Sequence, residues 1–192
     1  LEATDGNINI STTVLRDRTK TTTYGRKNTA VTRISDNSSN QSSDINIGGS
    51  LDMVASDNTT SPDSTSTTQA GNINIKGSNI TTTDNLTLTA TNDVNITSAQ
   101  DTTLSQAQGR IGKGKSFFSK STSTTNIESD LSTTNNGDIT ITSGYGNTDT
   151  IGATGSKGNL SIIASNLTTK DLDNNISNNA GSGNINLTAK NE

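Results

Sequence analysis

One short strand motif recurs along the whole chain. It consists of a turn residue followed by apolar, polar and apolar residues, and this alternation has the period of a strand with one buried face. Repetition of one short strand indicates a stacked solenoid, in which each repeat buries its apolar face only against its neighbours. The predicted fold class is therefore all-β, a parallel β-helix (solenoid) of short strands. Copies that open with glycine start at Gly6, Gly71, Gly137, Gly158 and Gly183, and two further copies start at Asp44 and Asp93.

The composition argues against a conventional globular core. Only 26% of the residues are hydrophobic and 2% are aromatic, whereas Ser, Thr and Asn supply nearly half of the chain. Such a composition is typical of disordered chains, which bury too little apolar surface to offset their conformational entropy. Disorder is therefore the alternative to the solenoid. The regular alternation in the motifs favours the solenoid, because a narrow stack needs only a thin column of Ile, Leu and Val.

Residue types on which many enzymes depend are missing. The chain has neither cysteine nor histidine, so it lacks thiolate ligands, the commonest metal ligand and the commonest general base. No apolar run reaches the length of a membrane span, and we expect no signal peptide at the start of the chain. We expect no catalytic residue, no cofactor and no metal site. We interpret residues 1–192 as a single β-helix segment cut from a longer rod.

The spacing of the motifs predicts the size of a coil. From Ile73 to Val94 the chain advances 21 residues through three short strands, which indicates a β-helix with three faces. The same step separates Ile139 from Leu160. A longer period of about 90 residues links every third motif, and predicts about two copies of a three-coil unit. The predicted interior consists of Ile8, Ile10, Ile45, Ile47, Ile73, Ile75, Leu86, Leu88, Val94, Ile96, Ile139, Ile141, Leu160, Ile162, Ile185 and Leu187.

Two excursions without the motif interrupt the coils, at residues 11–43 and 105–136. They hold ten of the fourteen Lys and Arg residues and three of the four aromatic residues, although the chain has a net charge of −4. Their Thr-rich runs favour strands, so each excursion is predicted to be a β-hairpin that leans on the coils or projects from them. The candidate contact residues are Arg16, Arg18, Lys20, Arg26, Lys27, Arg110, Lys113, Lys115, Phe117 and Phe118.

Several interpretations of these candidates are open. The cations form either a solvated hairpin surface or a contact with anionic lipid or polysaccharide. Phe117 and Phe118 either pin the hairpin onto the coils or face a membrane or a partner. Nucleic acid is not expected as a partner, because the chain is acidic overall and contains no recognition module.

Two further patterns suggest chemistry. Residues 109–116 read GRIGKGKS and match the letters of a phosphate-binding loop, but no apolar strand precedes them and the residues that follow favour strand over helix. A basic hairpin tip is the preferred interpretation. Asp5, Asp44, Asp93 and Asp138 each precede a strand motif, where a turn-forming role is expected. Because many β-helices cleave polysaccharides with clustered carboxylates, a carbohydrate-binding or carbohydrate-cleaving β-helix is retained as an alternative.

The segments GNINIKGSNI, NLTLTATNDVNITSAQDTT, GKGKSFFSKSTSTT and GDITITSG resemble the haemagglutinin-repeat region of filamentous-haemagglutinin-like exoproteins. This region also occurs in effectors of contact-dependent growth inhibition, and the resemblance covers essentially the whole chain. It implies a right-handed parallel β-helix, two-partner secretion through an outer-membrane transporter of Gram-negative bacteria, and a secreted rod on the bacterial cell surface. It further implies a structural role in adhesion or toxin delivery, and it supplies no catalytic residue. A segment that engages the outer membrane during toxin passage is another alternative.

Overall fold

The computed structural model describes residues 1–4, 6–26, 29–56, 71–111, 114–145, 158–170 and 183–190. All regular elements in these ranges are β-strands, which confirms the all-β class. The described residues therefore include no helix that is long and apolar enough to cross a membrane. The chain divides into two compact units. The stacked unit comprises Leu1–Thr12, Ser42–Ser98 and Glu128–Glu192, and the hairpin unit comprises Thr13–Gln41 and Ala99–Ile127.

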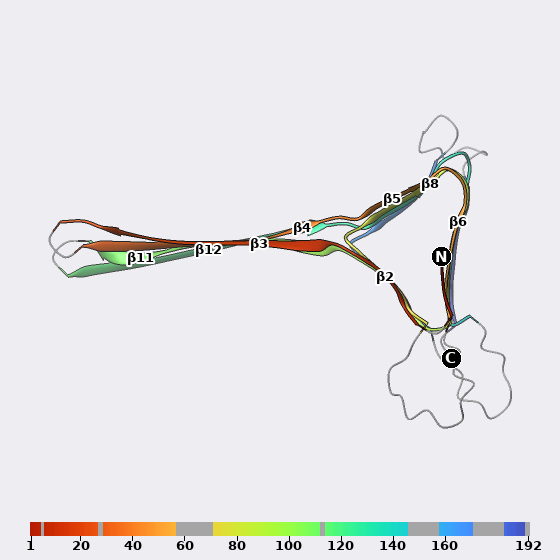
Figure 1. The fold of residues 1–192 in the computed structure, drawn as a ribbon, viewed down its shortest axis with the longest axis horizontal. Helices are drawn as coiled ribbons and strands as arrows, with labels where there is room; N and C mark the ends of the chain where they lie inside the picture. Colours follow the sequence, from red (N-terminus) through yellow and green to blue (C-terminus); the bar gives the residue numbers. More distant parts are fainter. Residues whose placement is uncertain are drawn as a thin grey trace, which may run out of the picture. The chain divides into compact units, whose positions relative to one another are not determined.

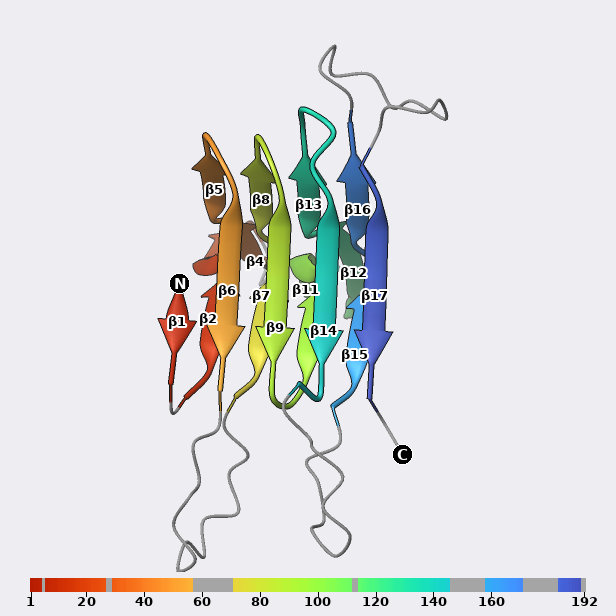
Figure 2. The ribbon, with the colours of Figure 1, turned by 90° about the vertical axis from the view of Figure 1, so that its right-hand side faces the viewer.

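Three parallel sheets form the stacked unit, and they surround one interior (Figures 1 and 2). Sheet 1 has the order β2 (Ile8–Ser11), β7 (Ile73–Lys76), β10 (Val94–Thr97) and β15 (Leu160–Ile163). Sheet 2 has the order β5 (Asp44–Ile47), β8 (Asn79–Thr82), β13 (Asp130–Thr133) and β16 (Asn166–Thr169). Sheet 3 has the order β1 (Glu2–Ala3), β6 (Leu51–Ala55), β9 (Leu86–Ala90), β14 (Ile139–Ser143) and β17 (Ile185–Ala189). From β2 onward, the chain visits sheets 1, 2 and 3 in turn, once in each circuit.

The strand register changes how the motifs are grouped. Val94 lies opposite Ile73 in sheet 1, as the 21-residue coil predicts. Leu160 also belongs to sheet 1, where it lies opposite Val94, but Ile139 lies opposite Leu86 in sheet 3. The step from Ile139 to Leu160 therefore joins two sheets, and its interpretation as a coil is wrong. The motif occurs in all three sheets because every strand with one buried face needs the same alternation.

Two circuits, rather than the expected three coils, make up the long repeat. Positions 8 and 94 both lie opposite Ile73 in sheet 1, and positions 45 and 131 both lie opposite Ile80 in sheet 2. Both pairs of positions are 86 residues apart. The first circuit of each repeat carries a hairpin between sheets 1 and 2, whereas the second joins β7 to β8 through Gly77 and Ser78 alone.

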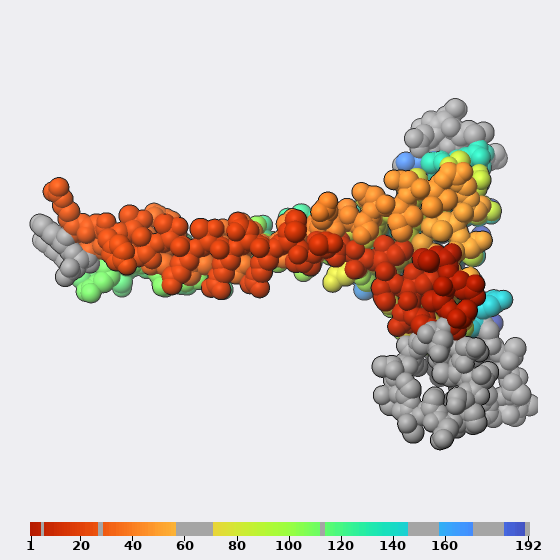
Figure 3. All heavy atoms as spheres, viewed as in Figure 1, coloured from red at the N-terminus to blue at the C-terminus, as the bar shows by residue number. Residues whose placement is uncertain are grey.

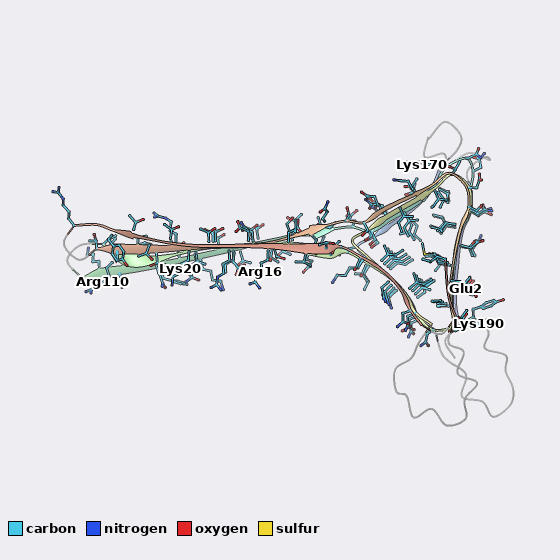
Figure 4. All side chains as sticks on the ribbon, viewed as in Figure 1. Glu2, Arg16, Lys20, Arg110, Lys170 and Lys190 are labelled. Atoms are coloured by element: carbon cyan, nitrogen blue, oxygen red, sulfur yellow. The ribbon has the colours of Figure 1, made fainter. Side chains whose placement is uncertain are left out.

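An aliphatic column fills the space between the three sheets, as the side chains in Figure 4 show. The predicted interior residues in the middle of the sheets, such as Ile73 and Ile139, are fully buried. Ile185 and Leu187 are instead 42% and 48% exposed, because β17 is the last strand of sheet 3 and no described strand stacks beyond it. Met53 is buried although it lies outside the motif.

The second excursion has different limits from those expected. The hairpin covers Ala99–Ile127 rather than residues 105–136. Residues Asp130–Thr133 form β13 of sheet 2, where Leu131 lies opposite Ile80 and is fully buried. Composition alone places this short strand in the excursion, because its single Leu is surrounded by the same Ser and Thr residues as the hairpin.

Asn and Asp side chains link successive circuits at the corner before sheet 1. The Asn7 side-chain oxygen accepts a hydrogen bond from the backbone N–H of Asn72, 2.8 Å away. Asn72 accepts one from Asp93 at 3.0 Å, and Asp93 accepts one from Asn159 at 2.8 Å. These bonds give corner N–H groups an acceptor in the neighbouring circuit.

The other described aspartates of the motif lie elsewhere in the circuits. Asp138, before sheet 3, accepts a hydrogen bond from the backbone N–H of Asn184 at 2.6 Å. Asp44, at the start of sheet 2, accepts one from the Asn79 side-chain amide at 2.8 Å. Asp5 lies outside the described residues. Asp93 and Asp138 thus lie at corners, as expected, whereas Asp44 is the first residue of β5. The described aspartates therefore do not occupy equivalent positions.

At two positions that open the motif, glycine is required for steric reasons. A β-carbon on Gly183 would collide with the backbone oxygen of Gly137, and a β-carbon on Gly137 would collide with the backbone oxygen of Asp84. Stacked turns bring backbone directly against backbone at this corner, so the side-chain volume of any other residue does not fit.

Candidate interaction surface on the hairpin sheet

The hairpin unit is one antiparallel sheet built from both excursions. Its strand order is β12-β11-β4-β3, so the two hairpins pair with each other through β4 and β11. In Figure 3, β3 and β4 are seen uncovered along this unit, in red to orange. All residues of β3 and most of β12 are exposed. The strands are β3 (Thr13–Tyr24), β4 (Ala30–Gln41), β11 (Ala99–Ile111) and β12 (Lys115–Ile127).

The hairpin sheet has the same 86-residue repeat as the stacked unit. Asp36 of β4 lies opposite Arg18 of β3 on one side and Leu104 of β11 on the other, and positions 18 and 104 are 86 residues apart. The physical reason is a match of dimensions. A hairpin is two strands wide, and two circuits of a stacked sheet also advance by two strand spacings, roughly 10 Å. Hairpins inserted in alternate circuits can therefore pair edge to edge.

Gly109 allows the two hairpins to approach closely near their tips. It lies opposite Val31 of β4 and opposite Phe117 of β12. A β-carbon at this position would collide with the backbone oxygen of Ala30 and would come within 2.9 Å of the Val31 Cα atom. Of the phosphate-loop letters at 109–116, residues 109–111 thus belong to the end of β11 and residues 115 and 116 to the start of β12, and Gly114 has a φ of 81°.

Side-chain alternation separates the charges of the sheet. Residues that pair across strands share a face, and neighbours along a strand lie on opposite faces. Here every pair joins two even-numbered or two odd-numbered positions. The even-numbered face, which we call the basic face, carries the cations Arg16, Arg18, Lys20, Arg110 and Lys120 against the single anion Asp36. The odd-numbered face, the neutral face, carries Arg33 and Lys115 against Asp17 and Asp101.

On the basic face, the carboxylate of Asp36 pairs with Arg16 and Arg18. Arg16 donates through Nε and Nη2 to the two carboxylate oxygens of Asp36, at 3.0 and 2.9 Å. These hydrogen bonds, with the charges of Arg16 and Arg18, hold the pKa of Asp36 below its usual value, and the same contact raises the pKa of Arg16. Ion pairs in the described ranges are those of Asp36 with Arg16 and Arg18. Lys20 and Arg110 are exposed and lie farther along the sheet (Figure 4).

The candidate contact residues do not form one cluster. Arg16, Arg18, Lys20, Arg110 and Phe118 lie on the basic face, whereas Lys115 and Phe117 lie on the neutral face. Arg26 is exposed next to a hairpin tip, and Lys27 and Lys113 lie outside the described residues.

Phe117 and Phe118 are not an aromatic pair. As neighbours in β12 they lie on opposite faces, and Phe117 is half-buried while Phe118 is 64% exposed. The candidate contact residues predicted from the sequence omit two members of the basic face, Lys120 and Tyr24, the latter 80% exposed. Period-2 counting along each predicted strand would have found both.

The described acidic residues do not gather into a metal site. No group of three or more His, Cys, Asp or Glu side chains that could hold a metal ion is found among the described residues. The corner aspartates described above instead accept hydrogen bonds from neighbouring circuits.

Comparison with known families gives one match. The family model of the hemagglutinin repeat matches residues 23–114. These residues run from the end of β3 to Gly114, just before β12, and include the complete circuit β7 to β9 with parts of the circuits before and after it. The match is close in length to the 86-residue repeat of the structure. No curated protein and no solved structure matches the chain.

Proposed function

We propose that this chain, which contains a hemagglutinin repeat, is a structural segment of a secreted rod on the bacterial cell surface and supports adhesion. The repeat belongs to a family of structural adhesins rather than enzymes, whose members are typically secreted surface exoproteins. In the longer protein, the rod would be exported through an outer-membrane secretion transporter and would carry adhesive or toxin-delivering parts.

The topology supports a rod built as a right-handed parallel β-helix. Each circuit is a crossover between neighbouring parallel strands of the same sheet, and such connections are right-handed in about 98% of cases. A stack of this kind lengthens by adding circuits, each of which buries its aliphatic residues against the previous one. The central circuits, with Ile73 and Val94 fully buried, show the packing that repeats.

The observation that carries the adhesive role is the charge of the hairpin sheet. Its strands carry seven cations and three anions, four net positive charges, in a chain whose net charge is −4. A basic sheet on an acidic scaffold suits weak, salt-sensitive contact with an anionic cell envelope, through outer-membrane lipid or anionic polysaccharide. Carbohydrate cleavage has less support, because Asp93 and Asp138 are engaged with backbone N–H groups.

Binding of the purified, fluorescently labelled chain to intact Gram-negative cells tests this proposal. The matched variant replaces both hairpins by a short Gly-Ser connection, as already found between β7 and β8. We expect the original chain to bind at about 0.1 M salt and to be released at about 1 M, where the Debye length falls to roughly 3 Å. The variant should keep its strand spectrum and lose the binding. Equal binding of the two proteins would contradict the proposed role of the hairpins.

A further inference from the structure

We propose that the outer part of the basic face is a docking surface for an anionic phospholipid bilayer, and that the neutral face is not. This inference rests on the proposed adhesive function and names the face and the chemistry of its partner. It concerns three adjacent cross-strand rows near the hairpin tips. The residues that carry it are Lys20, Tyr24, Arg110, Phe118 and Lys120.

The register places these side chains together on one face. Lys20 and Lys120 lie at the two ends of one cross-strand row. In this row Lys20 lies opposite Ile34, Ile34 opposite Gln106, and Gln106 opposite Lys120. The next row holds Phe118, and the row after that holds Tyr24 and Arg110. Successive rows on one face are about 7 Å apart, and the two edge lysines are separated by three strand spacings, about 14 Å.

These three rows combine charge with exposed aromatic surface. Lys20, Arg110 and Lys120 are exposed, and the ion pairs found in the described ranges lie elsewhere, at Asp36. Tyr24 is 80% exposed and Phe118 is 64% exposed. Cations that flank rings open to solvent match the headgroup region of a bilayer, where lipid phosphates bind the cations and aromatic rings partition between water and hydrocarbon.

A bilayer suits this face better than a soluble polyanion does. A polyanionic chain needs cations along its track and gains little from a Phe ring that has no polar group. The three rows also form a compact patch, which suits a plane, because strand twist turns more distant rows away from it. The rows that hold Arg16 and Arg18 are less suited to contact with a bilayer, because the negative charge of Asp36 partly neutralises the two cations.

The neutral face supplies a matched control from the same strands. Arg33 and Lys115 are exposed cations near the same tips, so Arg33→Gln with Lys115→Gln removes the same charge as Lys20→Gln with Lys120→Gln. The aromatic control is Phe117→Ser against Phe118→Ser. Thermal unfolding of each variant confirms that it is folded before binding is compared.

Co-sedimentation of the full chain with vesicles tests the inference. The vesicles contain phosphatidylcholine with phosphatidylglycerol, or phosphatidylcholine alone. Binding should require phosphatidylglycerol. Each removed cation of the basic face should weaken binding about fivefold, so the Lys20/Lys120 variant should bind about 25-fold more weakly. The Arg33/Lys115 variant should stay within about twofold of the original chain. Phe118→Ser should weaken binding, and Phe117→Ser should not.

The outcomes separate this inference from the proposed function. Equal loss in the Lys20/Lys120 and Arg33/Lys115 variants would overturn the one-sided surface. Failure of the original chain to bind phosphatidylglycerol vesicles while it still binds intact cells would overturn the lipid partner and leave adhesion standing. Failure to bind both the vesicles and the cells would overturn the two proposals together.

Discussion

Val31 of β4 and Gly109 of β11 lie directly opposite each other, and a β-carbon at Gly109 would come within 2.9 Å of the Val31 Cα atom. The two residues are far apart in sequence, yet their strands form the middle of one sheet. The contact depends on the absence of a side chain at Gly109, because a β-carbon there would meet the Ala30 and Val31 backbone.

Replacement of Gly109 by Val should open the pairing of β4 with β11 near the tips. The added atoms cannot be accommodated without moving the strands, at a cost of about 1–3 kcal/mol. Amide hydrogen exchange should accelerate around Val31 and leave the stacked unit unchanged. Gly48→Ala is the control, because a β-carbon at Gly48 meets no atom within 4 Å. Unchanged exchange in Gly109→Val would contradict the close approach.

Acid should weaken the hairpin sheet through Asp36. The hydrogen bonds from Arg16, with the nearby positive charges, lower the pKa of Asp36 in the folded state. The stabilisation is therefore fully present above the usual carboxyl pKa of about 4, and it is lost as the pH falls through the lower folded value. In Arg16→Gln, the Asp36 carboxyl should titrate at a higher pH by carbon-detected NMR, and the stability difference from the original chain should vanish in acid. A difference that grows in acid would refute this.

Ile139 should be among the most sensitive positions of the stacked unit. It is fully buried between Leu86 and Ile185 in sheet 3, so Ile139→Ala should cost about 2–5 kcal/mol in urea unfolding. Thr140 is its neighbour on the outer face of the same strand, and Thr140→Ala should cost far less. Similar losses in both variants would show that β14 does not have one buried face.

The corner bonds predict that Asp93 tolerates Asn and not Ala. Asn keeps the side-chain oxygen that accepts the N–H of Asn159, whereas Ala removes this acceptor, at a cost of about 1 kcal/mol. Thermal unfolding of the two variants makes the comparison. If both variants lose the same stability, the negative charge of Asp93 matters and the hydrogen bond does not.

The fold class follows from local alternation, but the assignment of strands to sheets does not. The pattern around Ile73 predicts a strand with one buried face, and 21 residues separate it from its neighbour at Val94. The same pattern around Ile139 gives no sign that this strand belongs to sheet 3. Strands of all three sheets have the same apolar–polar alternation, so only the register shows to which sheet a strand belongs.

Part of the basic face can be predicted from the sequence. Neighbours in a strand lie on opposite faces of the sheet. A strand over Phe117 and Phe118 therefore predicts that the two rings lie on opposite faces. The pairing of the two hairpins could not be predicted from the sequence. It depends on the width of a hairpin being equal to the distance that two circuits advance. That equality arises between distant segments and leaves no local signature around Ile34 or Gln106.

Hairpins from alternate circuits form one sheet with one register, and a pair of introduced cysteines tests this pairing. The chain contains no cysteine, so Ile34→Cys with Gln106→Cys creates a single pair at directly opposed positions of β4 and β11. Opposed Cα atoms in antiparallel strands lie about 4.5–5.5 Å apart, within the reach of a disulfide. The control pairs Ile34→Cys with Ala107→Cys, which lies on the other face. We expect rapid intramolecular disulfide formation in the first variant and not in the second. No disulfide in the first, or equal formation in both, would contradict the pairing.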